Sequence, residues 1–222
     1  MNESVIVLAG GDVTLWPDVS IFDSAEYIVG VDRGAYEGLK HGLNVTVAVG
    51  DFDSLTSSEL DYVKERVSKV EQFPSEKDET DTEIGLSVAS ELSKKGKIIL
   101  VGGTGGRVDH FLANLWLPLQ ERFQNIASRL VIKDNQNTIS YFFPGKYTIS
   151  KEADKQYLAF VCLTPMSHLS LYDPKYRLED VEVTTPTSYA SNEFVGETAT
   201  FSFASGVMCV IQSKDKEKSH LI

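Results

Sequence analysis

The strongest constraint on the fold is a change of pattern about 130 residues into the 222-residue chain. Before that point, short apolar runs typical of strands alternate with segments of helical periodicity. The expected strands are Val5–Ala9, Tyr27–Val31, Val45–Val49, Val70–Phe73, Ile98–Val101 and Leu130–Ile132, and the expected helices are Ser57–Ser68, Thr82–Lys95 and Asp109–Phe123. Strands that alternate with helices predict a mainly parallel sheet with right-handed crossovers.

The rest of the chain carries strand patterns alone. Short runs rich in β-branched and aromatic residues follow one another, separated by turn signals such as Pro144-Gly145 and Ser205-Gly206. This pattern predicts an antiparallel sandwich or barrel. We therefore expect an α/β fold with two domains: an N-terminal α/β domain with a mainly parallel sheet over residues 1–135, and a C-terminal antiparallel β-sandwich over residues 136–222.

Glycines and carboxylates follow the predicted strands of the N-terminal domain. The segments are Gly10-Gly11-Asp12, Asp32-Arg33, Asp51-Phe52-Asp53, Asp78-Glu79-Thr80-Asp81 and Gly102–Gly106. In an open parallel sheet, ligands bind beyond the carboxyl ends of the strands. Because all of these segments fall at that one edge, we expect a binding site there.

The acidic segments suit a metal ion. Asp51 with Asp53, and Asp78 with Asp81, place carboxylates at one sheet edge, where they repel one another unless cations neutralise them. Oxygen ligands of this kind are preferred by Mg²⁺. One alternative is that both segments only cap the helices that follow them. Nearby arginine and lysine side chains are a partial alternative to the metal.

The glycine-rich segment Gly102–Gly106 runs into Arg107 at the start of a predicted helix. Exposed backbone N–H groups and a helix N-terminus form an anion site, and an arginine binds phosphate oxygens in a forked geometry. The segment is not a Walker A loop, because no Gly-Lys-Ser/Thr follows it. A flexible connection is the alternative. Beside the aspartates, the segment favours a nucleoside triphosphate with Mg²⁺ and phosphoryl-type transfer.

Charge and hydropathy limit the classes of partner that the protein is expected to bind. The formal net charge of −11 argues against a nucleic-acid partner, which needs a basic face. The N-terminal segment lacks the basic region and cleavage site of a signal peptide, and no apolar run approaches the length of about 20 residues that a membrane helix needs. We therefore expect a cytoplasmic protein that binds neither nucleic acid nor membranes.

Four motifs together resemble the thiamine pyrophosphokinase family. They are Gly50–Leu55, Lys77–Asp81, Gly102–His110 followed by Leu112–Asn114, and Ser191–Phe194, in the family's order and spacing over nearly the whole chain. The resemblance implies transfer of pyrophosphate from ATP to the hydroxyl of thiamine, giving thiamine diphosphate and AMP. It also implies a homodimer with active sites at the subunit interface. Domain 1–135 would then be the nucleotide- and metal-binding catalytic domain, and domain 136–222 the thiamine-binding and dimerisation domain.

The resemblance also implies roles for individual residues. Mg²⁺ would be held by Asp51, Asp53 and Asp81, with Asp78 nearby, and Asp109 would complete the catalytic carboxylates. The expected nucleotide-binding residues are Asp32, Lys77, Thr82, Gly103, Thr104, Gly105, Arg107 and His110. Thiamine would contact Asp78, Asp109, Ser191 and Asn192, with Tyr176 stacked on its pyrimidine ring.

Two other functions are compatible with the residues. Asp51-Phe52-Asp53 after a strand fits a haloacid-dehalogenase-type phosphatase with an aspartyl nucleophile. In that class the nucleophile lies near the N-terminus, whereas here two strand–helix units precede the motif. A non-catalytic nucleotide- or metal-binding sensor would instead bind Mg-ATP and turn over nothing. A trapped aspartyl-phosphate would support the phosphatase, and binding without AMP formation would support the sensor.

Overall fold

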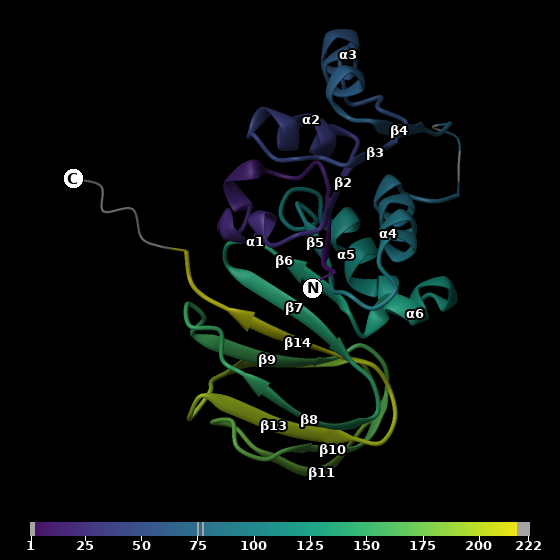
Figure 1. Cartoon of the computed structure of the whole chain (residues 1–222). Helices are drawn as coiled ribbons and strands as arrows, with labels where there is room; N and C mark the ends of the chain where they lie inside the picture. The colour runs from purple at the N-terminus through teal and green to yellow at the C-terminus, as the bar shows by residue number, and fades with distance from the viewer. Residues whose placement is uncertain (1–2, 75, 77, 217–222) are drawn as a thin grey trace, which may run out of the picture. The chain divides into compact units, whose positions relative to one another are not determined.

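The chain forms two compact units in a computed structural model that describes residues 3–74, 76 and 78–216. Unit 1 is Met1–Asn135 and unit 2 is Gln136–Ile222. Figure 1 shows helices and strands in the first unit and strands in the second. The mixed α/β architecture with a separate antiparallel sandwich is the fold class that the sequence predicts.

The six strands of unit 1 are parallel and follow the order β6-β5-β1-β2-β3-β4. They are β1 Val5–Leu8, β2 Tyr27–Val31, β3 Val47–Gly50, β4 Lys69–Gln72, β5 Ile98–Val101 and β6 Leu130–Lys133. All four residues of β1 are fully buried, as expected for a central strand covered on both faces. The predicted strands of this half are confirmed, with bounds that shift by one or two residues.

The helices of unit 1 are α1 Ser20–Asp23, α2 Arg33–Lys40, α3 Ser57–Arg66, α4 Asp81–Leu92, α5 Val108–Trp116 and α6 Gln124–Ala127. The helix expected over Asp109–Phe123 is wrong in its second half. Pro118 lies in a 3₁₀ turn, Leu117–Leu119, and proline cannot donate the hydrogen bond that would continue an α-helix. Within the described residues, no helix is long and apolar enough to cross a membrane.

The strand order places a topological switch between β1 and β5. From β1 the chain proceeds toward β2, and from β5 it proceeds toward β6, on the other side. Figure 1 shows α2 and α4 on opposite sides of these strands, and both contact β2. A crevice opens at such a point beyond the carboxyl ends of the strands, which is where a ligand site is expected.

Unit 2 consists of two antiparallel sheets that pack face to face. One has the order β12-β9-β14-β7 and the other β11-β10-β13-β8. The strands are β7 Asn137–Phe142, β8 Gly145–Ser150, β9 Tyr157–Cys162, β10 Met166–Leu171, β11 Leu178–Val183, β12 Thr187–Asn192, β13 Thr198–Phe203 and β14 Met208–Ser213. Alternate residues face inward, and Phe160 meets Phe201 edge to face at 5.3 Å between the sheets.

Candidate active site

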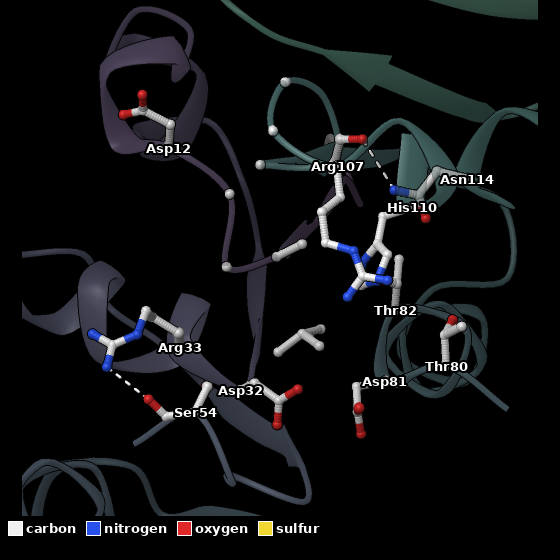
Figure 2. A pocket seen from close by; sticks show the side chains of 18 residues that line it. Asp12, Asp32, Arg33, Ser54, Thr80, Asp81, Thr82, Arg107, His110 and Asn114 are labelled. Atoms are coloured by element: carbon white, nitrogen blue, oxygen red, sulfur yellow. Dashed lines mark hydrogen bonds between the residues drawn. The ribbon is translucent and has the colours of Figure 1, made fainter. Parts of the chain in front are cut away.

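A cavity of about 560 Å³ lies at the carboxyl ends of the strands in unit 1 (Figure 2). This volume is typical of a small-molecule site. Its walls come from the segments after β1, β2 and β5, from a residue after β3, and from the first turns of α4 and α5. The lining residues are Ala9–Asp12, Val31–Arg33, Ser54, Thr80–Thr82, Gly102, Gly103, Gly105–Arg107, His110 and Asn114. The predicted sheet edge therefore does carry a cavity.

Three aspartates form a cluster at this edge. Oxygen atoms of Asp32, Asp51 and Asp81 lie within 4.8 Å of one another. Asp32 follows β2, Asp51 follows β3 and Asp81 is the first residue of α4, so three separate segments meet here. Figure 2 shows Asp32 and Asp81 on the same side of the cavity. Half-buried carboxylate oxygens at this spacing fit a hard divalent cation.

Asp32 is built rigidly into the cluster. It has a φ of +46°, rare for a residue with a side chain, and its Oδ1 accepts a hydrogen bond of 3.0 Å from the backbone N–H of Phe52. Gly50 has a φ of +143°, and a Cβ there would lie 1.9 Å from Asp32 Oδ1. Glycine is therefore required before the Asp51-Phe52-Asp53 turn, because only glycine leaves room for the Asp32 carboxylate.

The electrostatics of the cluster favour neutralisation. The pKa of Asp32 is raised from 3.8 to about 7, chiefly by burial and also by the neighbouring charges of Asp81 and Asp51, against the lowering effect of the Phe52 N–H. A bound cation would favour the ionised form of all three carboxylates. Perturbed carboxyl groups beside a cavity are typical of functional sites.

Two expected metal ligands lie outside the cluster. Asp53 is exposed, and its backbone N–H donates to Asp51 Oδ1 at 3.0 Å, which closes a tight turn. Asp78 is also exposed, and neither residue lines the cavity. Asp32, which the sequence placed with the nucleotide, takes their place beside Asp51 and Asp81. The sequence signal for this was the aspartate directly after β2, read with the same strand-end rule.

Asp81 is held by the start of α4. Thr80 and Glu83 form a reciprocal capping box, in which the Thr80 N–H donates to Glu83 Oε2 at 2.7 Å. Arg122 pairs with Glu83 Oε1 at 2.6 Å and also pairs with Glu79. Capping and metal binding are therefore compatible at this segment: Thr80 and Glu83 cap the helix, while the Asp81 carboxylate joins the cluster.

Arg33 fastens the neighbouring turn. Its Nη2 donates to the Ser54 carbonyl at 2.7 Å (Figure 2). The same Nη2 pairs with Glu59 Oε2 at 3.3 Å, and Nη1 lies 3.4 Å from Glu37 Oε1. The guanidinium therefore ties the segments after β2 and β3 to α3. Arg33 lines the cavity, although most of its hydrogen-bonding capacity serves this structural role.

The glycine loop, Gly102–Gly106, forms the opposite wall. Gly102, Gly105 and Gly106 have φ values of +73°, +74° and +65°, which only glycine adopts without strain. A Cβ on Gly11 would lie 2.3 Å from the Gly102 carbonyl oxygen, so the segments after β1 and β5 touch backbone to backbone. Such a loop before a helix N-terminus offers N–H groups to an anion.

The other expected nucleotide-binding residues divide into two groups. Thr82, Gly103, Gly105, Arg107 and His110 line the cavity together with Asp32. Thr104 is buried behind the loop and does not line the cavity. Lys77 lies outside the described residues. Asp109 is also absent from the cavity lining.

Arg107 and Asp109 interact with each other at the mouth of the glycine loop. Arg107 Nε donates to Asp109 Oδ1 at 3.1 Å, and Nη2 donates to Oδ2 at 2.5 Å. The hydrogen bond from Arg107 holds the pKa of the exposed Asp109 below its usual value. In this arrangement Asp109 is an ionised carboxylate whose position depends on the arginine.

The expected thiamine-binding residues of the sandwich lie together in unit 2. Asn192 is buried, its Oδ1 accepts from the Tyr176 N–H at 3.0 Å and its Nδ2 donates to the Tyr176 carbonyl at 2.8 Å. Tyr176 is exposed, and Ser191 is exposed with a φ of +59° at an irregularity of the β12–β9 pairing. Asn192 therefore holds the Tyr176 segment with both ends of its amide.

Comparison with known proteins identifies the family. Residues 19–130 match the family described as "Thiamin pyrophosphokinase, catalytic domain", and residues 146–208 match "Thiamin pyrophosphokinase, vitamin B1 binding domain". A curated thiamine pyrophosphokinase of Bacillus subtilis is 36% identical over 217 residues, which cover 96% of this chain and 100% of that protein. The chain belongs to the thiamin pyrophosphokinase family.

Solved structures of this family agree with the fold. A thiamin pyrophosphokinase family protein from Enterococcus faecalis has a TM-score of 0.93 at 46% identity, covering 96% of this chain and 100% of that one. Thiamine pyrophosphokinase from Bacillus subtilis has a TM-score of 0.84 at 33% identity, with the same coverage. The yeast enzyme, at 16% identity and a TM-score of 0.74, covers 96% of this chain and 86% of its own and shares the fold.

Family membership also confirms the expected enzyme class. The chain is a diphosphotransferase of the thiamin pyrophosphokinase family, and its second family match carries the name of a thiamine-binding domain. The comparisons give no support to the haloacid-dehalogenase-type phosphatase or to the non-catalytic sensor.

Proposed function

We propose that the chain transfers the pyrophosphate group of ATP to the hydroxyl of thiamine, with Mg²⁺ as the metal, and releases AMP. The observation that carries this proposal is one shared cavity. Asp32 and Asp81 of the carboxylate cluster line the same cavity as the glycine loop, and Asp51 completes the cluster. A metal site beside an anion-binding loop suits a metal-bound triphosphate.

Asp32, Asp51 and Asp81 are the proposed metal ligands. Three oxygen donors from three segments suit Mg²⁺, which takes oxygen ligands and keeps several waters. When bound, the ion would neutralise charge on the phosphate oxygens in the transition state. Asp53 and Asp78 have no ligand role in this arrangement, because their side chains lie outside the cluster.

The nucleotide phosphates are proposed to lie against the glycine loop. The backbone N–H groups of residues 102–106 and the guanidinium of Arg107 face a negative ligand, while Thr82 and His110 complete this side of the cavity. In the reaction, the thiamine hydroxyl oxygen attacks the β-phosphorus. The bond from that phosphorus to the oxygen bridging to the α-phosphate breaks, and AMP leaves with that oxygen.

A carboxylate is proposed to take the proton that the thiamine hydroxyl loses. The candidates are Asp81 in the cluster and Asp109 beside Arg107. The hydrogen bond from Arg107 lowers the pKa of Asp109, which keeps this carboxylate ionised but also makes it a weaker proton acceptor. Thiamine itself is proposed to be bound through the Tyr176 ring, with Ser191 beside it and Asn192 as the residue that fixes the tyrosine segment.

We also propose that the protein is a cytoplasmic homodimer. The support on the chain is three exposed apolar side chains on and after α5, Val108, Trp116 and Leu119, which are 68%, 50% and 37% exposed. Large apolar side chains exposed on the surface of one chain are often covered by a partner in a protein interface. A molar mass from light scattering at twice 24.6 kDa would support the dimer, and a single 24.6 kDa species at micromolar concentration would contradict it.

The activity is tested by identifying the nucleotide product. The protein is incubated with ATP, Mg²⁺ and thiamine, and nucleotides are separated by chromatography. We expect AMP only when thiamine is present. ADP or free phosphate as the product, or no turnover, would contradict the proposal.

The assignment of ligands is tested with a matched pair of variants. Asp51→Asn and Asp53→Asn make the same chemical change two residues apart, inside and outside the cluster. We expect Asp51→Asn to lower kcat/KM at least about 100-fold, about 2.7 kcal/mol, and Asp53→Asn to lower it much less. Equal losses would refute the three-aspartate assignment.

A further inference from the structure

Two buried side chains hold the glycine loop from behind. Thr104 Oγ1 donates to Asp134 Oδ2 at 2.7 Å, and Asn114 Nδ2 donates to the Gly103 carbonyl at 3.0 Å. Figure 2 shows the second of these bonds beside His110. Thr104, Asn114 and Asp134 are only 9%, 7% and 5% exposed. Asp134 comes directly after β6 and Asn114 lies on α5, so two elements anchor one loop.

The anchored part of the loop packs closely against the residues behind it. Thr104 is the only residue among 102–106 with a side chain. A Cβ on Gly103 would lie 2.9 Å from Leu100 and 3.1 Å from Asn114 Nδ2, so the loop backbone is pressed against its support. A Cβ on Gly106, by contrast, would meet nothing within 4 Å. One end of the loop is fixed from behind and the other faces open space.

A glycine-rich loop without anchors would bind an anion poorly. Glycine loses more conformational freedom on ordering than any other residue, at about 1 kcal/mol relative to alanine. Fixing a loop in its bound conformation before the ligand arrives removes that cost from the binding step. A hydrogen bond between buried groups is suited to this task, because leaving a buried partner unsatisfied costs about 1–3 kcal/mol.

We infer that Thr104, Asp134 and Asn114 are positioning residues that hold the glycine loop in its phosphate-binding conformation before the nucleotide arrives. The inference rests on the proposed function, because it takes the nucleotide phosphates as the ligand of this loop. None of the three side chains needs to touch the phosphates. They act through the backbone of Gly103 and Thr104, whose position determines where the N–H groups of the loop point.

The test replaces a threonine hydroxyl with a methyl group at two positions, one in the loop and one outside it. Thr104→Val removes the hydroxyl donor and keeps the shape, and Thr104→Ser keeps the hydroxyl. Thr46→Val is the matched control, because Thr46 Oγ1 donates to the Ile28 carbonyl at 2.9 Å just before β3, at the end of the strand away from the cavity. If Thr104→Val does not fold, Asn114→Leu removes the other anchor.

Nucleotide affinity is the first readout. Mg-ATP binding is measured by calorimetry without thiamine, and KM is then measured for each substrate. For Thr104→Val we expect the Kd and KM for ATP to rise about tenfold, equivalent to about 1.4 kcal/mol, with the KM for thiamine within about twofold. Thr104→Ser and Thr46→Val should bind ATP within about twofold of wild type. A general loss of structure would not produce this selectivity.

Amide hydrogen exchange of residues 102–106 in the ligand-free protein is the second readout. We expect faster exchange in Thr104→Val than in wild type or Thr46→Val. Wild-type exchange together with ATP affinity within twofold of wild type would overturn the inference, as would an equal loss of affinity in Thr46→Val. If wild type itself bound no Mg-ATP, the proposed function would fail, while faster loop exchange in Thr104→Val would still support the anchoring.

Discussion

Replacing Asp32 with asparagine should make the metal-free protein more stable and the enzyme inactive. Asparagine keeps an oxygen that accepts the hydrogen bond from the Phe52 N–H, and it removes a charge that burial and the Asp81 and Asp51 carboxylates disfavour. The pKa of Asp32 rises from 3.8 to about 7 on folding. A displacement of about three pH units corresponds to about 4 kcal/mol at most, and screening of this half-buried group by water reduces it to about 2 kcal/mol.

The pH dependence follows from the sign of this shift. A carboxyl group whose pKa is higher in the folded state destabilises the fold above its unfolded value, and the penalty grows until the folded pKa is passed. The gain from Asp32→Asn should therefore be full above pH 7 and shrink as the pH falls toward 4. A gain of about 2 kcal/mol corresponds to about 5 °C in Tm for a chain of this size.

The assay is thermal unfolding in EDTA at several pH values, repeated with Mg²⁺. We expect Mg²⁺ to raise the Tm of wild type and to have little effect on Asp32→Asn, whose turnover should fall at least about 100-fold. Asp53→Asn is the control, because its exposed carboxylate lies outside the cluster and its stability should change by less than about 0.5 kcal/mol. A variant that is less stable than wild type in EDTA at pH 8, or a gain independent of pH, would refute the reasoning.

Three further predictions concern the surroundings of the cavity and the sandwich. Gly105→Ala should weaken Mg-ATP binding slightly more than Gly106→Ala, because both have positive φ but only the Cβ at 105, 2.4 Å from Leu15 Cδ1, would also displace a side chain; calorimetry compares the two, and equal affinities would contradict this. Arg122→Ala should weaken Mg²⁺ binding several-fold in a metal titration, because Arg122 pairs with the capping glutamate of α4, and equal affinity would contradict this link. Asn192→Ala should raise the KM for thiamine toward that of Tyr176→Ala and leave the KM for ATP unchanged, because its amide holds the tyrosine segment.

Much of the fold follows from pattern alone. The parallel strands of unit 1 are short apolar runs, and the sandwich strands alternate inward and outward residues, so periodicity locates both. Periodicity does not predict helix α2, because its buried residues, Gly34, Ala35 and Gly38, are small and form no apolar stripe. Periodicity does not predict strand β12 either, since Thr187–Asn192 is mostly polar and only its last residue is buried.

The sequence predicts which edge of the sheet carries the site. The positions of individual side chains at that edge follow only from the folded structure. Strand ends are visible in sequence, which is why Asp51, Asp81 and the glycine loop could be placed together. The cluster contains Asp32 instead of the expected Asp53. This difference depends on positive φ values at Asp32 and Phe52, which are properties of the folded backbone. Thr104 was expected to face the nucleotide, but its buried bond to Asp134 turns it the other way.

This cavity is proposed to position a triphosphate for attack at its β-phosphorus. The most direct measurement uses ATP labelled in the γ-phosphate, with Mg²⁺ and thiamine, and follows the label into each product. The account predicts label in thiamine diphosphate, unlabelled AMP in equal amount, and loss of both products in Asp51→Asn. Label in free phosphate or in thiamine monophosphate, or unchanged turnover in Asp51→Asn, would contradict it.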